Sequence, residues 1–581
     1  MPFDALRFFL PGFSVLFVLG TFNSTCPANA QYSGQVSATP ARQYPAAKHG
    51  LDFSVGPRGL DSLSYNGRSL LRAVQDGELQ PWKSVFRAVL DVLLSRFSSA
   101  VATPNKQADS IDLRYPWGRV SCGYGKQGEK LTMRIQVSNT SAETLNEVSL
   151  RLMELNFPNV PAGGTLEAGQ FGFGFKGPDW ALHQGPPSIP SVADPRFVVP
   201  IIQVDYGTGV LNFCSDDLEC CVNVPYSTNS PARTSYPFII SCRDIKPGAT
   251  KTFNVSLRFG PAGSRVQDLS SDVLQAYAKK YPFRVNWSDR RPIGAIYLAS
   301  SGINVATNPR RWIMNEGKID VTTGEGKAAF REALLKLADN SIKVLKDANA
   351  QGMITWDPEG QEFLESCYYG DPRLTPVLAP ETEVKSDQGL TAIDEYFDKF
   401  RRAGLKVGVC LRPQQITIVN DKPAQGAADD QHAGQVLKDK LAYAKKRWGC
   451  TLFYIDSTVR VTNDSLDPHV FKVVADAHPD VLLIPENESM RYFAYSAPLN
   501  SYVHHKVTST PAGARMVYPN AFSVLMAPDG DRPEDHDALV TAVRHGDILL
   551  FNGWYNNEGV AEIKKLYEEA ALGNADSTPQ R

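Results

Sequence analysis

The 581-residue sequence predicts an antiparallel β-sandwich followed by a (β/α)8 barrel of the TIM type. In the first half, apolar and polar residues alternate in short runs separated by turns, which is the pattern of strands with one buried face. In the second half, short apolar runs alternate with amphipathic helical stretches, as in parallel strands joined by helices. We expect a signal peptide (1–30), a flexible leader (31–48), a sandwich (49–265), a helical linker (266–290) and a barrel (291–575).

The N-terminal residues have the pattern of a secretory signal peptide. Arg7 precedes an apolar run over residues 8–19, and Ala28-Asn29-Ala30 offers a cleavage site between small residues. The apolar run is too short for a good membrane span. We therefore predict that residues 1–30 are removed and that the mature protein is secreted or periplasmic, with no stable insertion into the membrane.

Composition argues against several partners and cofactors. The net charge of −2 gives no bulk attraction to nucleic acid or to anionic membranes. No Cys-x-x-Cys pair is present, and His504 and His505, if adjacent on a strand, would point to opposite faces. We therefore expect no cofactor and no metal. An oxidising compartment would permit one or two disulfides among the cysteines of the first half, which are Cys122, Cys214, Cys220, Cys221 and Cys242.

The predicted sandwich rests on period-two alternation. Leu131, Met133, Ile135 and Val137 alternate with polar residues, and residues 253–259 repeat the pattern. The dipeptide Asn66-Gly67 is typical of a tight hairpin turn. After the sandwich, a helix over about 268–280 would place Leu269, Val273, Ala276 and Tyr277 on one face, and Tyr281-Pro282 would end it.

Eight strand-and-helix units follow in the second half. Gly404 and Gly449 are expected to end the helices after strands two and three. The alternative is an open doubly wound sheet, but no glycine-rich turn follows strand one, which counts against a nucleotide-binding version. The expected strands are 294–298, 353–356, 406–411, a fourth ending at Asp456, a fifth at 481–485 ending at Glu486, a sixth between Ser501 and Val517, a seventh at 522–526 and an eighth at 548–551.

Two carboxylates follow neighbouring strands of the predicted barrel. Asp456 comes directly after the apolar run 452–455, and Glu486 follows 481–485. Residues at the carboxyl ends of barrel strands line the active site. A pair of carboxylates there suits glycosidic-bond chemistry, with one ionised group and one proton donor. The alternative for both residues is capping of the next helix, and Glu488 competes with Glu486 for the role of donor.

Other polar and aromatic residues at strand ends are candidates for substrate binding. Arg412, after strand three, could line a pocket or form an ion pair with Asp357 or Asp456. The segment around Pro358 and Gly360 predicts a shaped loop, and its alternative is a solvated acidic turn. The complete set of expected substrate-binding residues is Trp356, Asp357, Glu359, Arg412, Asn552 and Trp554.

A sandwich followed by a barrel, with Asp456 ending strand four and Glu486 ending strand five, resembles retaining glycoside hydrolases. The most similar are the endo-α-N-acetylgalactosaminidases and, more distantly, the α-amylase superfamily, in which the strand-four Asp is the nucleophile and the strand-five Glu the acid/base. Tyr454 stands where α-amylases place an arginine. The clan of α-galactosidases and α-glucosidases is similar in its sandwich and strand-four Asp, but takes its proton donor from strand six.

The resemblance implies a secreted glycoside hydrolase that cleaves an α-linked glycosidic bond of an oligosaccharide or polysaccharide by a two-carboxylate, retaining mechanism. Asp456 would be the nucleophile and Glu486 the acid/base. One alternative is a non-catalytic carbohydrate-binding or scaffold protein on a degenerate barrel, because a fold does not imply catalysis. Another is a barrel lyase or isomerase with Asp357 or Glu359 as its base.

Overall fold

The computed structural model describes residues 50–575 apart from internal stretches. Outside the described residues lie the predicted signal peptide and leader, together with Glu488, His504, His505 and Trp554. The internal stretches left out are 57–58, 72–86, 93–96, 101–102, 108–109, 158–166, 171–191, 225–234, 301–302, 304, 316–317, 362–367, 369, 372–373, 420–421, 427, 459–465, 488, 502–509, 528–535 and 554–557.

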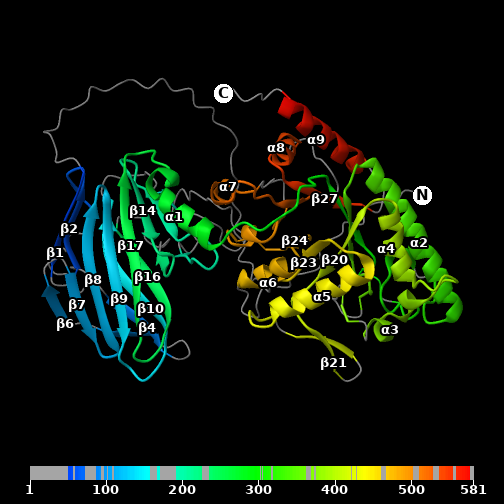
Figure 1. Cartoon of the computed structure of the whole chain (residues 1–581), viewed down its shortest axis with the longest axis horizontal. Helices are drawn as coiled ribbons and strands as arrows, with labels where there is room; N and C mark the ends of the chain where they lie inside the picture. The colour runs from blue at the N-terminus through cyan, green and yellow to red at the C-terminus, as the bar shows by residue number, and fades with distance from the viewer. Residues whose placement is uncertain are drawn as a thin grey trace, which may run out of the picture.

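The first half forms antiparallel sheets, as predicted (Figure 1). One sheet has the order β11-β13-β14-β17-β9-β8-β7-β6, a second has the order β12-β15-β16-β10-β4-β5, and β1-β2-β3 form a small third sheet. Phe213 of β14 and Phe238 of β16 meet edge to face between the two large sheets, with ring centroids 5.2 Å apart. The strands are β1 (Leu51–Gly56), β2 (Gly59–Tyr65), β3 (Arg68–Ser69), β4 (Arg87–Val92), β5 (Phe97–Ala100), β6 (Thr103–Gln107), β7 (Ser110–Tyr115), β8 (Gly118–Gln127), β9 (Lys130–Asn139), β10 (Leu145–Asn156), β11 (Glu167–Gln170), β12 (Val192–Ala193), β13 (Ile201–Asp205), β14 (Val210–Ser215), β15 (Cys221–Asn223), β16 (Ser235–Ile245) and β17 (Thr250–Gly260).

The alternating pattern of the sequence has the expected physical cause. The apolar residues of β9, from Leu131 to Val137, are buried, while the residues between them are partly or fully exposed. The turn between β2 and β3 contains Asn66 and Gly67 with φ of 50° and 76°. Both residues are therefore left-handed, which is the conformation that a type I′ turn requires.

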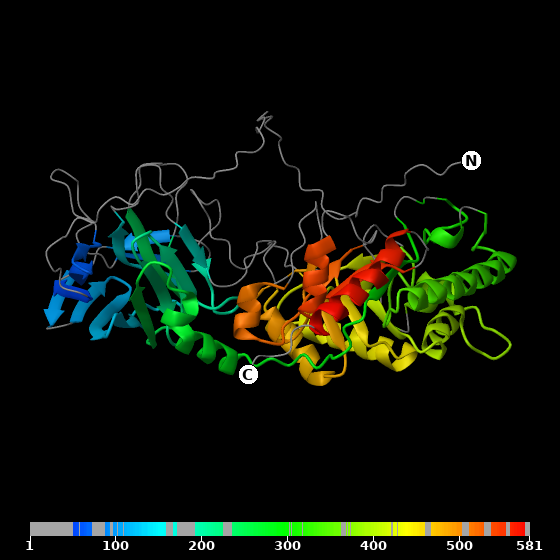
Figure 2. The same cartoon turned by 90° about the horizontal axis from the view of Figure 1, so that it is seen from above.

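Helix α1 (Val266–Lys280) leads from the sandwich to the barrel, as the two views of the chain show (Figures 1 and 2). Val273, Leu274 and Tyr277 form its buried face. Ser270, also buried, accepts a hydrogen bond from Asn212 of β14 (2.9 Å), so the helix is fastened to the sandwich by polar as well as apolar contacts.

The second half is a parallel barrel whose strands neighbour one another in chain order. The ladder runs β24-β23-β20-β19-β18-β27-β26-β25, and the Ala497 N–H donates to the Leu483 carbonyl (2.9 Å) across the remaining gap between β24 and β25. The strands are β18 (Ile293–Tyr297), β19 (Gly352–Trp356), β20 (Lys406–Leu411), β23 (Leu452–Ile455), β24 (Leu482–Pro485), β25 (Leu499–Ser501), β26 (Val524–Met526) and β27 (Ile548–Asn552), and β21 (Ile416–Val419) pairs with β22 (Lys422–Gln425) in a separate hairpin.

Helices cover the outside of the barrel (Figure 1), and their ends follow local chemistry. The Thr391 hydroxyl caps α4, accepting from the Asp394 N–H (3.2 Å). Gly404 and Gly449 adopt φ of 79° and 73° after α4 and α5, so both predicted stops are left-handed C-terminal glycines. The helices are α2 (Gly324–Asp347), α3 (Thr375–Leu378), α4 (Ala392–Arg402), α5 (Ala433–Trp448), α6 (His469–Ala477), α7 (Ala512–Val517), α8 (His536–Arg544) and α9 (Glu558–Ala575), with short 3-10 turns η1 (Ile313–Asn315), η2 (Pro380–Glu383) and η3 (Tyr492–Ala494).

The sixth barrel strand lies earlier than predicted. It is β25, which begins at Leu499 and ends at Ser501, whereas residues 512–517 at the end of the predicted window form α7. Pro511 directly precedes this helix, at a position where its fixed φ is tolerated. A strand of three residues is too short to give a readable alternation, which explains the error.

The described residues also bear on the predictions about disulfides and about insertion into the membrane. All five cysteines of the first half are free and buried, so the disulfides expected among them are not formed. A search of the described helices for a long apolar segment found none that could cross a membrane.

Candidate active site

Asp456 and Glu486 lie side by side at the carboxyl edge of the barrel. β23 and β24 are parallel neighbours, with Ile455 opposite Pro485. Each carboxylate residue adds one more main-chain bond to its ladder: the Asp456 N–H donates to the Leu411 carbonyl and the Glu486 N–H to the Ile455 carbonyl, both at 2.9 Å. The strand pairing therefore brings the two residues together.

The two carboxyl groups are close enough to influence each other, because the Asp456 side chain contributes to the raised pKa of Glu486. Glu486 Oε2 accepts from the Ser457 N–H (2.9 Å), in the residue directly after Asp456. Ser457 has a φ of 53°, a left-handed conformation that costs energy in a residue with a Cβ and is concentrated at functional sites. Ser457 and Thr458, which directly follow Asp456, are not helical, so Asp456 is not a helix N-cap, and that alternative is wrong.

Arg412 holds Asp456 from the neighbouring strand. It follows β20, and its Nε donates to Asp456 Oδ2 (2.7 Å), with a second contact from Nη2 to the same oxygen. A charge-assisted pair of this kind stabilises negative charge on the carboxylate. The ion pair between Arg412 and Asp456, one of two considered from the sequence, is therefore present.

The loop that carries Arg412 is itself held in place. Lys440 of α5, a buried lysine, donates from Nζ to the main-chain carbonyls of Arg412 (3.0 Å) and Gln414 (2.7 Å). Gln414 Nε2 then donates to the Ser457 carbonyl (3.2 Å). The segments after β20 and β23 are therefore tied to each other next to the carboxylate pair.

Burial raises the pKa of Glu486 from 4.5 to about 7, and the negative charge of Asp456 adds to the rise. The Ser457 N–H and the Arg412 charge oppose the rise more weakly. Near neutral pH, Glu486 therefore holds a proton that it can give up, beside a carboxylate stabilised by an arginine. A carboxyl group whose pKa is raised in this way is suited to the role of a general acid.

This raised pKa predicts a pH-dependent stability. A carboxyl whose pKa is higher in the folded than in the unfolded protein stabilises the fold below its unfolded pKa, and this contribution is lost as pH rises through about 7. At pH 8 we expect Glu486→Gln to unfold at a higher temperature than the wild type, with a free energy of unfolding larger by up to a few kcal/mol. At pH 4.5 the two proteins should differ little. Thermal unfolding measured across this range tests the expectation, and a difference independent of pH would contradict it.

Trp356 lies in a row of aromatic rings rather than on an open wall. Its ring centroid is 5.0 Å from that of Tyr297 and 4.9 Å from that of Tyr454, and the residue is 6% exposed. Most of its surface is already covered, although it was expected to offer a stacking face. Burial raises the pKa of Tyr454 well above its ordinary value, and the charges of Glu486 and Asp456 raise it further, which places Tyr454 close to the carboxylate pair.

Asp357 and Glu359 are buried rather than solvated. Asp357 is 2% exposed, has a φ of 55° and accepts a hydrogen bond from Gln361 Nε2 (3.1 Å). Glu359 has no exposed surface and accepts from the Thr375 hydroxyl. The Gly360 N–H returns to the Asp357 carbonyl (2.9 Å). The predicted shaped loop is present, and the solvated-turn alternative is wrong. Substrate binding by these two carboxylates remains a prediction.

Asn552 ends β27, on the far side of the barrel from β23 in the ladder order. It is partly buried, and its partner in the ladder is Ala295 of β18. Tyr297, Tyr454 and Ser457 belong to the neighbourhood of the carboxylates but were not among the predicted site residues. Tyr454 had a signal in the sequence, because it lies two residues before Asp456 on a strand and shares its face.

Within the described residues, no group of three or more histidine, cysteine, aspartate or glutamate side chains is arranged to hold a metal ion. At this edge of the barrel the described residues include the Asp456–Glu486 pair, with Arg412 bound to Asp456 and the ring of Tyr454 close by.

Comparisons with known proteins agree with this fold. No family model and no curated protein sequence matches the chain. Among solved structures, the α-N-acetylgalactosaminidase NagBb from Bifidobacterium bifidum is similar with a TM-score of 0.52 and 9% identity, over 90% of this chain and 92% of that one. The GH31 family sulfoquinovosidase from E. rectale gives 0.48 and 10%, over 90% and 83%. The GH36 α-galactosidase AgaB from Geobacillus stearothermophilus gives 0.44 and 10%, over 87% and 76%.

The architecture is therefore that of sandwich-and-barrel glycoside hydrolases, as the resemblance in the sequence implied, and no single family is assigned. At this level of identity the similarity describes the fold. The role of each residue has to be argued from the geometry of the carboxylate pair.

Proposed function

We propose that the protein is a glycoside hydrolase that cleaves an α-linked glycosidic bond with retention of configuration. The observation that carries the proposal is the Asp456–Glu486 pair at the ends of adjacent parallel strands, with Arg412 bound to Asp456. The α-linkage is supported by the fold shared with an enzyme described as an α-N-acetylgalactosaminidase. The signal-like N-terminus supports secretion or export to the periplasm.

The two carboxyl groups take different parts in a double displacement. An Asp456 oxygen attacks the anomeric carbon while Glu486 gives its proton to the leaving glycosidic oxygen, so that a glycosyl ester forms and the aglycone departs. Glu486, now a carboxylate, takes a proton from water, and the water oxygen attacks the same carbon. The ester breaks, the sugar is released, and both carboxyl groups return to their starting states.

The closeness of the pair supports retention. Retaining glycosidases hold their carboxyl groups about 5–5.5 Å apart, whereas inverting enzymes hold them about 6.5–9.5 Å apart to admit a water molecule. Asp456 and Glu486 directly follow Ile455 and Pro485, which are partners in adjacent parallel strands, and neighbouring strands lie about 4.8 Å apart. This spacing is much closer to the retaining range than to the inverting range.

The sequence around strand six also supports Glu486 as the proton donor. In the clan of α-galactosidases and α-glucosidases, the donor comes from strand six. Residues 499–520 of this chain, which include β25 and α7, contain no aspartate and no glutamate. Glu486, which has a pKa of about 7 and follows the strand next to that of Asp456, is the better-placed donor.

A hydrolysis screen with the protein beginning at residue 31 tests the proposal. The panel consists of aryl α- and β-glycosides of common hexoses and N-acetylhexosamines, together with oligosaccharides. We expect hydrolysis of at least one α-glycoside, with the α-anomer as the first product seen by proton NMR. First release of the β-anomer would contradict retention. Saturable binding of an oligosaccharide without any hydrolysis would favour the carbohydrate-binding alternative.

A further inference from the structure

The loop after Glu486 is fastened to the sandwich. Arg491 lies in this loop, and its main-chain N–H donates to the Phe197 carbonyl (2.9 Å). Its Nη1 donates to the Arg196 carbonyl (3.3 Å). Arg196 and Phe197 lie between β12 and β13, so both acceptors belong to the sandwich. The acid/base candidate thus lies on a segment that a different domain holds.

The Arg491 side chain joins more than these two segments. The residue is 8% exposed, and its guanidinium lies 4.2 Å from the ring centroid of Tyr281, at the end of the linker helix. Nη1 also lies 3.6 Å from Asp467 Oδ1, in the loop that follows Asp456. One buried arginine therefore contacts the sandwich, the linker and the loops of both candidate catalytic residues.

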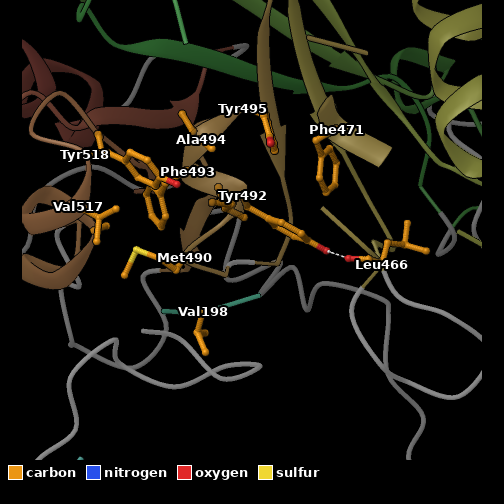
Figure 3. Packing of buried hydrophobic residues seen from close by; sticks show 14 of the residues in the cluster. Val198, Leu466, Phe471, Met490, Tyr492, Phe493, Ala494, Tyr495, Val517 and Tyr518 are labelled. Atoms are coloured by element: carbon orange, nitrogen blue, oxygen red, sulfur yellow. Dashed lines mark hydrogen bonds between the residues drawn. The ribbon is translucent and has the colours of Figure 1, made fainter. Parts of the chain in front are cut away.

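A chain of hydrogen bonds connects the loop after Glu486, which carries Arg491, with the loop after Asp456. Asn487, directly after Glu486, donates from Nδ2 to the Thr458 hydroxyl (2.9 Å). The Leu466 N–H donates to the Thr458 carbonyl (3.1 Å). The Tyr492 hydroxyl, next to Arg491, donates to the Leu466 carbonyl (2.7 Å; Figure 3). Displacement of Arg491 would therefore shift both of these loops.

The sandwich side of this junction is also fixed. Asp194 accepts from the Arg196 N–H (2.9 Å) and from Arg243 Nη1 of β16 (3.1 Å), which ties the acceptor segment to the sheet. Val198 belongs to the same buried apolar cluster as Met490 and the residues of η3 (Figure 3). The loop that carries Glu486 therefore packs on a segment that is itself hydrogen-bonded to the sandwich sheet.

We propose that the sandwich segment 194–199 sets the position of the proton donor, and that Arg491 is the positioning residue through which it acts. This inference rests on the proposed function for its consequence in catalysis. The sandwich is then part of the catalytic apparatus without touching the substrate. Precise placement of an acid is worth a large factor in rate, because small displacements of a catalytic group are costly.

The test compares Arg491→Met with the wild type by two measurements. The first follows the protonation of Glu486 by infrared difference spectroscopy across pH, with Glu486→Gln identifying the band. We expect the midpoint in Arg491→Met to fall by at least about one pH unit, because a loosened loop admits water to the carboxyl. The second measures kinetics, and we expect kcat to fall about 10-fold or more with a smaller change in KM. Arg491→Lys, which keeps the charge but not the planar donors, should lie between the two.

Arg515→Met is the matched control. Arg515 pairs with buried Asp547 (3.0 Å), which directly precedes β27 and so lies at the opposite end of the barrel. The Arg515→Met change should lower the unfolding temperature and leave the midpoint of Glu486 protonation unchanged. If Arg491→Met does not fold, Asp467→Asn weakens the same junction with little change in shape.

Each outcome decides one claim. An unchanged midpoint in a destabilised Arg491→Met would overturn the positioning role and leave Arg491 as a structural contact. A shifted midpoint together with wild-type protein that hydrolyses no glycoside would remove the proposed function, while the positioning of Glu486 by the sandwich would stand on the titration alone.

Discussion

Replacement of Asp456 by asparagine is expected to abolish glycosidase turnover, with a loss of about 10⁴-fold or more, because loss of a nucleophile removes the covalent route itself. Asparagine keeps the shape of the side chain and can still interact with Arg412, so the fold should survive. The measurement is kcat/KM on the best aryl glycoside, with circular dichroism confirming the fold. The same change should lower the pKa of Glu486, since the negative charge of Asp456 contributes to its rise.

Rescue by a small anion separates a nucleophile from a merely structural carboxylate. In Asp456→Ala, azide can enter the vacated space and attack the anomeric carbon from the same side. The product should then be a glycosyl azide of inverted configuration. Asp480→Asn, which removes an exposed carboxylate paired with Lys445, is the control and should retain wild-type rates. Near-wild-type turnover by Asp456→Asn would end the assignment.

Replacement of Glu486 by glutamine is expected to remove the alkaline limb of the rate profile. The proton donor is active when protonated, so wild-type kcat/KM should fall as pH rises through about 7. Without the titrating group, this limb disappears and the rate falls by about 10²–10⁴-fold on substrates whose leaving group needs a proton. The loss should be much smaller on aryl glycosides with acidic leaving groups. Rate profiles on both kinds of substrate provide the measurement.

A second glutamate provides the control for this variant. Glu219 forms a salt bridge with Lys280 at the surface and is well exposed. Glu219→Gln should keep both the rate and the alkaline limb. A limb that persists in Glu486→Gln would assign the proton donor to another residue.

The sequence predicted that Asp456 and Glu486 lie side by side because the local strand pattern and the order of strands in a barrel agree there. Each follows a continuous apolar run, and consecutive parallel strands of a barrel are neighbours. The contact between Arg412 and Asp456 was foreseeable for the same reason, since β20 and β23 are adjacent. The raised pKa of Glu486 depends on side-chain direction and burial, which strand order does not specify.

Where prediction from the sequence was incomplete, the cause is packing between segments far apart in the chain. Trp356 was expected to offer an exposed stacking face, but the rings of Tyr297 and Tyr454 pack against it. Glu359 belongs to a segment that could have formed a solvated acidic turn, but it accepts a hydrogen bond from the Thr375 hydroxyl in a later segment. Arg491 carries no motif at all. Its importance follows from a sandwich loop almost three hundred positions earlier in the chain.

The junction at Arg491 has an evolutionary consequence. Its two acceptors in the sandwich are the carbonyl oxygens of Arg196 and Phe197, and every amino acid supplies such an oxygen. Side chains at these two positions can therefore drift without loss of the hydrogen bonds, provided that the backbone keeps its path. Homologues could then differ at both positions and still keep the two domains in register, so that sequence comparison alone would overlook the connection.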